Sequence, residues 1–387
     1  MSIASVFSLA ALLGSVAGQG TIVNLNQRSL PFWREDTEVS FDTPHGTLEH
    51  VQTLELRDAD DPGGSRFRGL SSLLASPDGL QLLAISDRGV FIRMTALPTV
   101  GDRFVIREAT IDPMYDTNGR TIRYRSSEGD AEGLAVEGTY EGGGAGDLIV
   151  SYEKPRIVLK FPDGVESRQS QDMEISEIFR ECPSDRAPEA ILSVQCERGS
   201  WQLRSPPALC SDSDVLPRGS LLMFCPRGRG VVPPPSSGNV VFLGFAYDGR
   251  TVKRFYVEFP GQHELTDVAQ LSDGDTMILF RRPGVDAMII AYITQEELQE
   301  ALASGGTLTP DIILNVQRRD GYNVAREAGM AVREDPTSGR IFVNVVNKDT
   351  ISSVVKRTQL TTFEWKPKRR AWWCRLFPFL CREDEDD

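Results

Sequence analysis

The sequence is poor in the residues and motifs on which several enzyme classes depend. Its 387 residues include only three histidines, His45, His50 and His263, which are too scattered to indicate a catalytic triad. No G-x-S-x-G elbow, Walker loop, H-E-x-x-H pair or G-x-G-x-x-G turn occurs. These absences argue against α/β-hydrolase, P-loop, zinc-protease and dinucleotide-binding chemistry.

Positive charge is also in deficit. The chain has 42 lysines and arginines against 55 acidic residues, for a formal net charge of −13. Because no basic domain offsets this balance, we do not expect nucleic acid to be a partner. The excess of carboxylates favours solubility and local cation binding, and the number of arginines leaves room for an anion site.

Long apolar runs are absent after the first twenty residues. The opening stretch, MSIASVFSLAALLGSVAGQG, has an apolar core of about a dozen residues, which is short for a bilayer span. We interpret residues 1–18 as a secretory signal peptide; a membrane anchor and a buried helix are the alternatives. The protein is therefore expected to be secreted or extracytoplasmic.

The six cysteines fit export but indicate no metal site. No C-x-x-C pair occurs and no histidine lies near a cysteine, which argues against zinc and thioredoxin-like sites. We expect two disulfides among the four mid-chain cysteines and one in the tail, with the mid-chain pairing left open. These residues are Cys182, Cys196, Cys210, Cys225, Cys374 and Cys381.

Four similar stretches recur along the chain, each with two apolar strands joined by a turn and ending on polar residues. When Leu70, Leu134, Val268 and Met330 are aligned, the outer intervals are about 60 residues and the middle one is about twice as long. Such units are typical of a β-propeller, whose blades cannot bury their faces alone. We predict an all-β protein, a β-propeller of six blades, with five to seven compatible; a pair of β-sandwiches is the alternative.

Two segments depart from this repeat, which we assign to a propeller domain at residues 19–365. Residues 181–237 hold four cysteines and the run VVPPPSSG, and are interpreted as a disulfide-containing insertion in one blade. Residues 366–387 are basic, then aromatic, then acidic, which fits either a peripheral membrane contact or a solvated tail. One helix is predicted, between Thr294 and Gly306, from its Thr-x-x-Glu capping box.

Acidic residues stand at corresponding strand starts and ends of the repeat. In a propeller these strand ends lie on one face, around the central channel. Carboxylates from several blades suit calcium, which takes six to eight oxygen ligands. The alternative is that these residues cap turns and join neighbouring blades. The expected calcium ligands are Asp87, Asp130, Glu132, Glu153, Asp267 and Glu327.

Basic residues near the same strand ends suit an anion. Arg88, Lys154 and Arg326 are expected to bind an anionic group of the substrate, because guanidinium groups bind phosphate with paired hydrogen bonds. A cation beside a guanidinium can polarise a phosphate ester and activate water. Glu132, Glu153 and Arg88 are therefore the candidate catalytic residues. For the stretch Ser-Asp-Arg-Gly that contains Arg88, a simple turn is the alternative.

At GLSSLLASPDGLQLLAISDRG and DAEGLAVEG…GDLIVSYEKPRIVLKF the sequence resembles the phytase-like family, described as having esterase-like activity of phytase. Its GLS…SDRG, D-x-EGLA and S-x-E motifs occur in the family's order, and LTDVAQLSDGDTMIL and EAGMAVREDPTSGRIFVNVVNKD resemble later blades. The resemblance extends from Leu54 to Trp365 and implies an exported propeller-like protein with phosphate-ester or carboxylic-ester hydrolase activity.

The sequence departs from this family at its acidic positions. The mid-chain FEGLA element is not visible, Phe280-Arg281 follows TMIL, and Val346-Asn347-Lys348-Asp349 replaces a closing SDDN. We expect a calcium-assisted hydrolase of a small phosphorylated or ester substrate. The alternative is a non-catalytic propeller that binds a protein or glycan partner through its rim. The sequence leaves the oligomeric state open.

Overall fold

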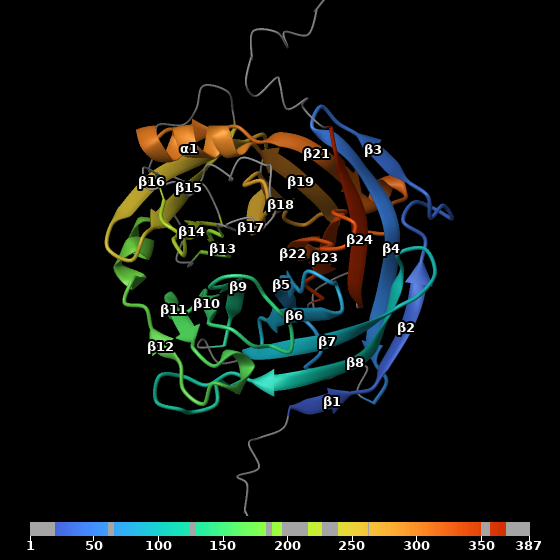
Figure 1. Ribbon diagram of the computed structural model, residues 1–387, viewed down its shortest axis with the longest axis horizontal. Coiled ribbons are helices and arrows are strands. Elements are labelled where there is room, and N and C mark those ends of the chain that lie inside the picture. Colours follow the sequence, from blue (N-terminus) through green and yellow to red (C-terminus); the bar gives the residue numbers. More distant parts are fainter. Residues whose placement is uncertain are drawn as a thin grey trace, which may run out of the picture.

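The computed structural model describes residues 20–60, 66–123, 129–182, 188–195, 216–226, 239–261, 263–349 and 357–368. These residues form five sheets arranged as the blades of a β-propeller around a common axis (Figure 1). The all-β prediction and the propeller are confirmed. Five blades lie within the range expected from the sequence, one fewer than the six that it favoured.

We number the blades in chain order of their innermost strands and give the strands from the axis outward. Blade 1 contains β5 (Leu70–Ala75), β6 (Gln81–Ser86), β7 (Val90–Pro98), β8 (Phe104–Pro113) and β1 (Thr21–Val23). Blade 2 contains β9 (Ala131–Val136), β10 (Leu148–Tyr152), β11 (Ile157–Phe161) and β12 (Gln171–Asp172). Blade 3 contains β13 (Ala190–Ser193), β14 (Leu221–Phe224), β15 (Val240–Tyr247), β16 (Val252–Phe259) and β20 (Thr307–Leu308).

The last two blades follow the same pattern. Blade 4 contains β17 (Glu264–Gln270), β18 (Thr276–Arg281), β19 (Ala287–Ile293) and β21 (Asp311–Gln317). Blade 5 contains β22 (Glu327–Glu334), β23 (Ile341–Asn347), β24 (Thr358–Pro367), β4 (Gly46–Asp58) and β2 (Leu25–Leu30), with β3 (Ser40–Asp42) paired to β4. Within the described residues, the helices are α1 (Gln295–Ser304) and three short 3-10 helices, Gly164–Glu166, Ser176–Glu181 and Arg318–Asp320.

The N-terminal strands close the ring and explain the blade count. β4 pairs with the C-terminal strand β24 from Gly46 opposite Pro367 to Leu56 opposite Thr358, so blade 5 joins the two ends of the described chain. β1 lies on the outer edge of blade 1. The N-terminal strands thus complete existing blades and add no sixth. The long middle interval of the repeat holds one innermost strand, β13.

Apolar packing between neighbouring blades holds the ring together. Five clusters of buried apolar side chains fill the five interfaces between consecutive blades, including the one between blades 5 and 1. The inner strands contribute to clusters on both sides, and every residue of β9 (AEGLAV) is buried. A strand covered on both faces is apolar throughout and does not alternate, which is why these strands stood out in the sequence.

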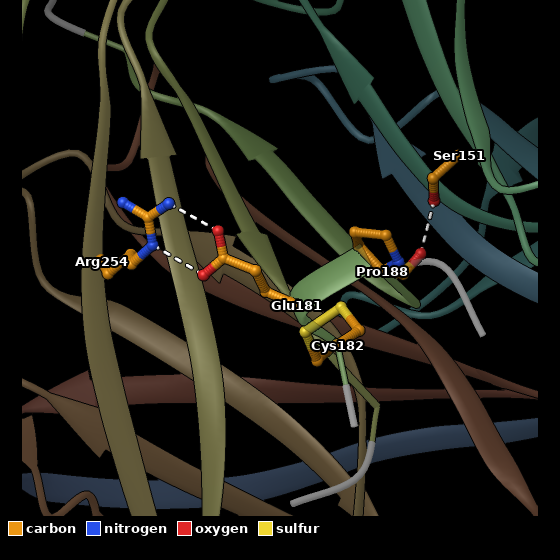
Figure 2. The surroundings of a disulfide bond; sticks show 6 residues. Ser151, Glu181, Cys182, Pro188 and Arg254 are labelled. Carbon is orange, nitrogen blue, oxygen red and sulfur yellow. Dashed lines mark hydrogen bonds and ion pairs between the residues drawn. A yellow bond between two sulfur atoms is a disulfide. The ribbon is translucent and has the colours of Figure 1, made fainter. Parts of the chain in front are cut away.

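A disulfide between Cys182 and Cys225 joins the end of a 3-10 helix to the end of β14 (Figure 2). Nearby, the carboxylate of Glu181 accepts two hydrogen bonds from Arg254 at 2.5 and 2.7 Å. A disulfide indicates an oxidising, extracytoplasmic environment. The signal peptide expected at residues 1–18, the other four cysteines and residues 369–387 of the tail lie outside the described residues.

The segment 181–237 does more than interrupt the repeat. It contains β13 and β14, which are the two inner strands of blade 3. The predicted helix is present as α1, where the Thr294 side chain accepts a hydrogen bond from the backbone N–H of Glu297 and Gly305 ends the helix in a left-handed conformation. Within the described residues, no helix is both long and apolar enough to span a membrane.

Replacing both Cys182 and Cys225 with alanine is expected to lower the free energy of unfolding by about 2–4 kcal/mol, because the disulfide restricts the unfolded chain. Alanine is chosen because both positions are buried and a serine hydroxyl would lack a partner. Urea unfolding measures the change. Finding these two thiols free by mass spectrometry of the untreated wild-type protein would contradict the assignment.

Candidate functional site

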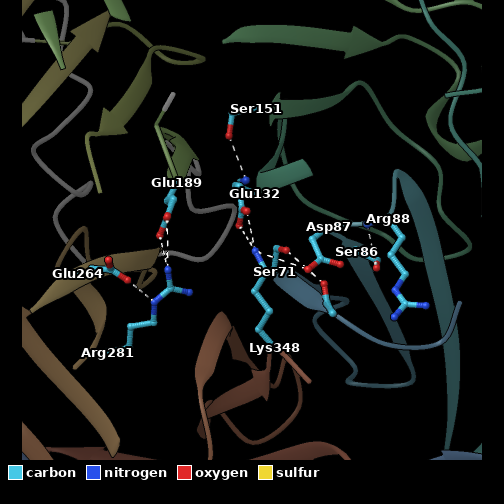
Figure 3. Close-up of polar contacts among 12 residues, drawn as sticks. Ser71, Ser86, Asp87, Arg88, Glu132, Ser151, Glu189, Glu264, Arg281 and Lys348 are labelled. Atoms are coloured by element: carbon cyan, nitrogen blue, oxygen red, sulfur yellow. Dashed lines mark hydrogen bonds and ion pairs between the residues drawn. The ribbon is translucent and has the colours of Figure 1, made fainter. Parts of the chain in front are cut away.

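Charged side chains gather at one end of the propeller, where the innermost strands begin and their neighbours end. We call this end the rim face. Figure 3 shows several of these residues converging from different blades. Their contacts, given below, join blades 1, 2 and 5 in one group and blades 3 and 4 in another. The residues are Asp87, Asp130, Glu132, Glu153, Glu189, Glu264, Arg281, Arg326, Lys348 and Asp349.

A β-bulge places Glu132 at the rim face. In blade 2, Ala131 pairs with Tyr152 and Gly133 with Ser151, so Glu132 between them has no partner in the ladder. A bulge of this kind re-aims the side chain of the extra residue. The same irregularity occurs near the start of β5, β17 and β22, where the corresponding residues are Ser71, Thr266 and Ala328. Blade 2 is therefore the blade whose bulge carries a carboxylate.

Lys348 is the direct partner of Glu132. Its ammonium group donates to both carboxylate oxygens of Glu132, at 2.6 and 2.8 Å, and lies 3.9 Å from Oδ2 of Asp87. Lys348 follows β23 of blade 5, whereas Glu132 belongs to blade 2 and Asp87 to blade 1. Both Lys348 and Glu132 are buried. The ion pair therefore crosses the axis and connects blades that are not neighbours in the ring.

Three carboxylates form the centre of the site. Oxygen atoms of Asp130, Glu132 and Glu153 all lie within 4.8 Å of one another, and we call these residues the carboxylate cluster. The backbone N–H of Glu153 donates to the carbonyl of Asp130 at 2.8 Å, which holds the start of β9 beside the end of β10. Carboxylate oxygens at this spacing are the donors that a hard cation such as calcium takes.

Burial changes the acidity of this cluster. It raises the pKa of Glu132 to about 7, while the ammonium of Lys348 acts to lower it and Asp130 acts to raise it. The pKa of Asp130 is also raised, first by burial and further by Glu153, with Lys348 opposing. A carboxyl group with a pKa near 7 can both accept and release a proton at neutral pH. Glu132 therefore has a pKa that suits a general base.

A second buried ion cluster occupies the opposite part of the rim face. Arg281, at the end of β18, donates through Nε to Glu264 at 2.7 Å and lies 3.4 Å from the carboxylate of Glu189. Glu189 precedes β13, so this cluster joins blades 3 and 4. Burial raises the pKa of Glu189 and Arg281 opposes that rise. Arg326 lies half-buried near this cluster, and burial and Arg281 lower its pKa.

The predicted anion-binding residues differ in how they lie relative to the carboxylate cluster. Arg88 is 6% exposed, and Figure 3 shows its guanidinium pointing away from Lys348 and Glu132. Lys154 is exposed in the loop after Glu153. The cation in contact with Glu132 is thus Lys348, and not the arginine that the sequence placed there.

Asp267 lies deeper along the axis than the other expected calcium ligands. Its Oδ2 accepts hydrogen bonds from the Ser72 hydroxyl at 2.9 Å and from the backbone N–H of Met330 at 2.8 Å. These donors belong to β5 and β22, so the carboxylate connects the innermost strands of three blades. Burial raises the pKa of Asp267 well above its ordinary value. Its contacts are those of a residue that joins blades.

Glu327 faces the packing between blades and not the carboxylate cluster. In β22 the bulge falls on Ala328, so Ala328 corresponds to Glu132, and Glu327 corresponds to the core residue Ala131. A shift of one residue along a strand turns a side chain to the other face. One oxygen of Glu327 accepts from the backbone N–H of Ala325 at 2.8 Å. The other is buried without a partner among the described residues.

Sequence reasoning gave no site role to four residues of the rim face: Glu189, Arg281, Lys348 and Asp349. Arg281 and Lys348 were visible as departures from the acidic positions of the resembled family. Glu189 lies within the segment that was interpreted as an insertion. The contacts that define their roles join different blades, so no local spacing encodes them.

The carboxylate cluster fits a bound calcium ion in its donor type. Asp130 and Glu153 are half-buried and offer oxygens next to Glu132. Glu132 already accepts from Lys348 through both oxygens. A cation would therefore be held chiefly by Asp130 and Glu153 and would share Glu132 with the lysine, completing its six to eight ligands from solvent or substrate.

No curated protein matches the chain. Among solved structures, a chain of the mitotic checkpoint complex is 11% identical, with a TM-score of 0.35 over 94% of this chain and 99% of that chain. A Myceliophteria thermophila β-propeller domain is 9% identical, with a TM-score of 0.32 over 88% and 99%. The hydrazine synthase of Kuenenia stuttgartiensis is 12% identical, with a TM-score of 0.32 over 79% and 66%. These likenesses carry no argument about function.

A family match does extend over the propeller. The phytase-like family, described as esterase-like activity of phytase, matches residues 65–349. That range contains the carboxylate cluster, Lys348 and the innermost strand of every blade. Because the match covers well over half of the 387 residues, the chain belongs to the phytase-like family.

Proposed function

We propose that the protein is an exported hydrolase of small phosphate or carboxylic esters and that the carboxylate cluster on the rim face is its active site. The observation that carries this proposal is the grouping of Asp130, Glu132 and Glu153, with a pKa of about 7 for Glu132. The description of the family as esterase-like supports the same class of reaction. Lys348 adds a buried cation beside the carboxylates.

Hydrolysis requires a water molecule to lose a proton as its oxygen attacks the phosphorus or carbonyl carbon. The ester oxygen then leaves and takes up a proton. Glu132 is the group suited to accept the first proton, since its pKa matches neutral pH. Lys348 fixes the orientation of Glu132 and supplies positive charge close to the negative charge that develops on the ester. The same carboxyl group can return the proton to the leaving oxygen.

Asp130 and Glu153 have a different role in this proposal. They are only partly buried and would hold the cation that the cluster fits. A bound calcium ion supplies polarisation of the ester oxygen and of water. Arg326, half-buried on the rim face, and Lys154, exposed in the loop after Glu153, are proposed to attract the anionic part of the substrate.

Wild-type protein is expected to hydrolyse p-nitrophenyl phosphate or p-nitrophenyl acetate in calcium, with kcat/KM rising with pH through about 7 as Glu132 loses its proton. The variant E132Q should lose about 100-fold or more in kcat, because a glutamine cannot accept the proton. Steady-state rates with calcium and with chelator measure both effects. The control is E296Q, which changes an exposed residue of α1.

Absence of turnover with both esters in calcium, together with a melting temperature that calcium does not raise, would overturn the proposal. A second function would then remain. Arg281 and Lys348 stand where the family's pattern is acidic, and each neutralises carboxylates of the rim face. A rim of satisfied ion pairs suits a non-catalytic propeller that binds a protein or glycan partner.

A further inference from the structure

The ammonium group of Lys348 lies where a metal ion would bind Glu132. It contacts both carboxylate oxygens, at 2.6 and 2.8 Å, and a calcium ion held by such oxygens lies about 2.3–2.6 Å from them. Figure 3 shows the lysine pointing toward Asp87 as well, whose Oδ2 is 3.9 Å from the ammonium. An oxygen of Asp130 lies within 4.8 Å of one of Glu132. One lysine of blade 5 thus reaches carboxylates of blades 1 and 2.

Lys348 is held in this position at both ends of its side chain. Its backbone N–H donates to the carbonyl of Arg326 at 2.8 Å, and the next residue, Asp349, accepts from Arg68 at 3.2 and 3.3 Å. Lys348 is 8% exposed and Glu132 is 5% exposed. Separating a buried ammonium from a buried carboxylate leaves two uncompensated charges, which is strongly unfavourable. The lysine is therefore a permanent occupant of this position.

The lysine takes from the carboxylate cluster what calcium binding requires. The affinity of a calcium site depends on the number of its oxygen ligands and on their total negative charge. Lys348 uses both oxygens of Glu132 and offsets one negative charge. A second cation in contact with the same two oxygens would lie against the ammonium and be repelled by it. Calcium would then be held chiefly by Asp130 and Glu153.

We propose that Lys348 is an internal competitor of calcium, which occupies the position between Glu132 and Asp87 and keeps the calcium affinity of the carboxylate cluster low. This inference rests on the proposed function, because it concerns the cation of the same site. Wild-type protein is expected to bind calcium with a dissociation constant of about 10⁻⁴–10⁻³ M, the range of extracellular calcium sites. Such a site fills only where calcium is abundant.

Calcium chloride is the probe, titrated by calorimetry into the full-length protein at pH 8. K348M is expected to bind calcium at least about 10-fold more tightly than wild type, because both oxygens of Glu132 become ligands and the competing charge is gone. K348Q removes the charge but keeps a hydrogen-bond donor for Glu132, so it decides the outcome where K348M does not fold. The matched control is K160M, which removes a lysine 2.9 Å from Glu137 and 2.7 Å from Asp147 at the opposite end of blade 2, and should bind calcium like wild type.

A change at Asp87 tests where the additional affinity arises. With the lysine removed, Asp87 faces Glu132 across the vacated position and is expected to become a ligand. K348M/D87N, or K348Q/D87N where K348M does not fold, should therefore lose most of the gain in calcium affinity. D87N alone should change the wild-type affinity much less, because the ammonium already fills the position beside Asp87.

Equal calcium affinity in wild type and K348Q overturns the inference, and so does a gain that D87N leaves intact. These outcomes are separate from a failure of the proposed function. If wild type hydrolyses either ester while the lysine variants gain no calcium affinity, only the role of Lys348 as competitor is wrong. If the variants gain an affinity that depends on Asp87 while wild type hydrolyses neither ester, that role stands and the hydrolase proposal fails.

Discussion

Replacing Lys348 with methionine is expected to lower the free energy of unfolding by about 3–5 kcal/mol at pH 8, the loss typical of breaking a buried ion pair. Methionine fills the volume of the lysine stem but leaves Glu132 without its two hydrogen bonds of 2.6 and 2.8 Å. Asp130, and Asp87 at 3.9 Å from the ammonium, then face Glu132 without an intervening cation. Urea unfolding measures the change.

The loss in K348M should shrink as pH falls. Without the lysine, the pKa of Glu132 rises further above about 7, so the carboxyl group takes up a proton and its uncompensated charge disappears at pH 5. The double variant K348M/E132Q removes that charge at every pH and should recover most of the stability lost at pH 8. A loss below about 1 kcal/mol in K348M, or a double variant no more stable than K348M, would show that the pair does not hold blades 5 and 2 together.

The propeller was accessible from the sequence because its inner strands are buried on both faces. Runs such as AEGLAV and QLLAIS are mostly apolar, are buried along nearly their whole length and recur at regular intervals. The blade number was less accessible. Closing the ring depends on the pairing of β4 with β24, two strands about 300 residues apart in the chain. No local pattern distinguishes a strand that completes a blade from one that begins another.

The three residues of the carboxylate cluster were among the expected calcium ligands, but the sequence predicted ligands converging from several blades, and these three come from blade 2 alone. Asp130 precedes β9, Glu132 is its second residue and Glu153 follows β10, so a single pair of adjacent strands brings them together. Glu327 was placed with them because EAGMA resembles the EGLA of blade 2. The extra alanine before the glycine moves Glu327 out of the bulge and into the packing between blades. A difference of one residue decides the face of a strand, and similarity of motif does not resolve it.

Which cationic side chain contacts the carboxylates depends on contacts across the propeller axis. Arg88 is next to Asp87 in sequence, and it was expected to bind the anionic group of the substrate at the rim, beside the carboxylates. Lys348 of blade 5 instead contacts Glu132 of blade 2, although the two residues are 216 positions apart in the chain. The replacement of an acidic motif by Val-Asn-Lys-Asp was visible in the sequence. Its consequence, a buried ammonium in contact with two carboxylates, requires the closed ring.

Replacing Glu327 with glutamine is expected to stabilise the protein at pH 8 and leave its stability nearly unchanged at pH 4. The pKa of Glu327 is raised from 4.5 to about 7, chiefly by burial and in part by the nearby Asp286, while the N–H of Ala325 opposes the rise. Between these two values the folded protein binds more protons than the unfolded chain. Stability therefore falls as pH rises from about 4.5 to about 7, and the full cost is present at pH 8.

The size of the expected gain in stability follows from the difference between the folded and unfolded pKa values of Glu327. Since a rise of one in pKa corresponds to about 1.4 kcal/mol, the wild-type carboxylate at pH 8 costs about 3 kcal/mol relative to an unshifted glutamate, and E327Q removes that cost. Glutamine retains the oxygen that accepts from Ala325 and replaces a carboxylate oxygen that has no partner among the described residues.

Chemical unfolding of wild type and E327Q at pH 4, 6 and 8 measures the difference, with E296Q on exposed α1 as the control. A gain that is the same at pH 4 and pH 8 would mean that packing, and not the charge of Glu327, sets the effect; a loss at pH 8 would mean that the ionised carboxylate has a partner that stabilises it.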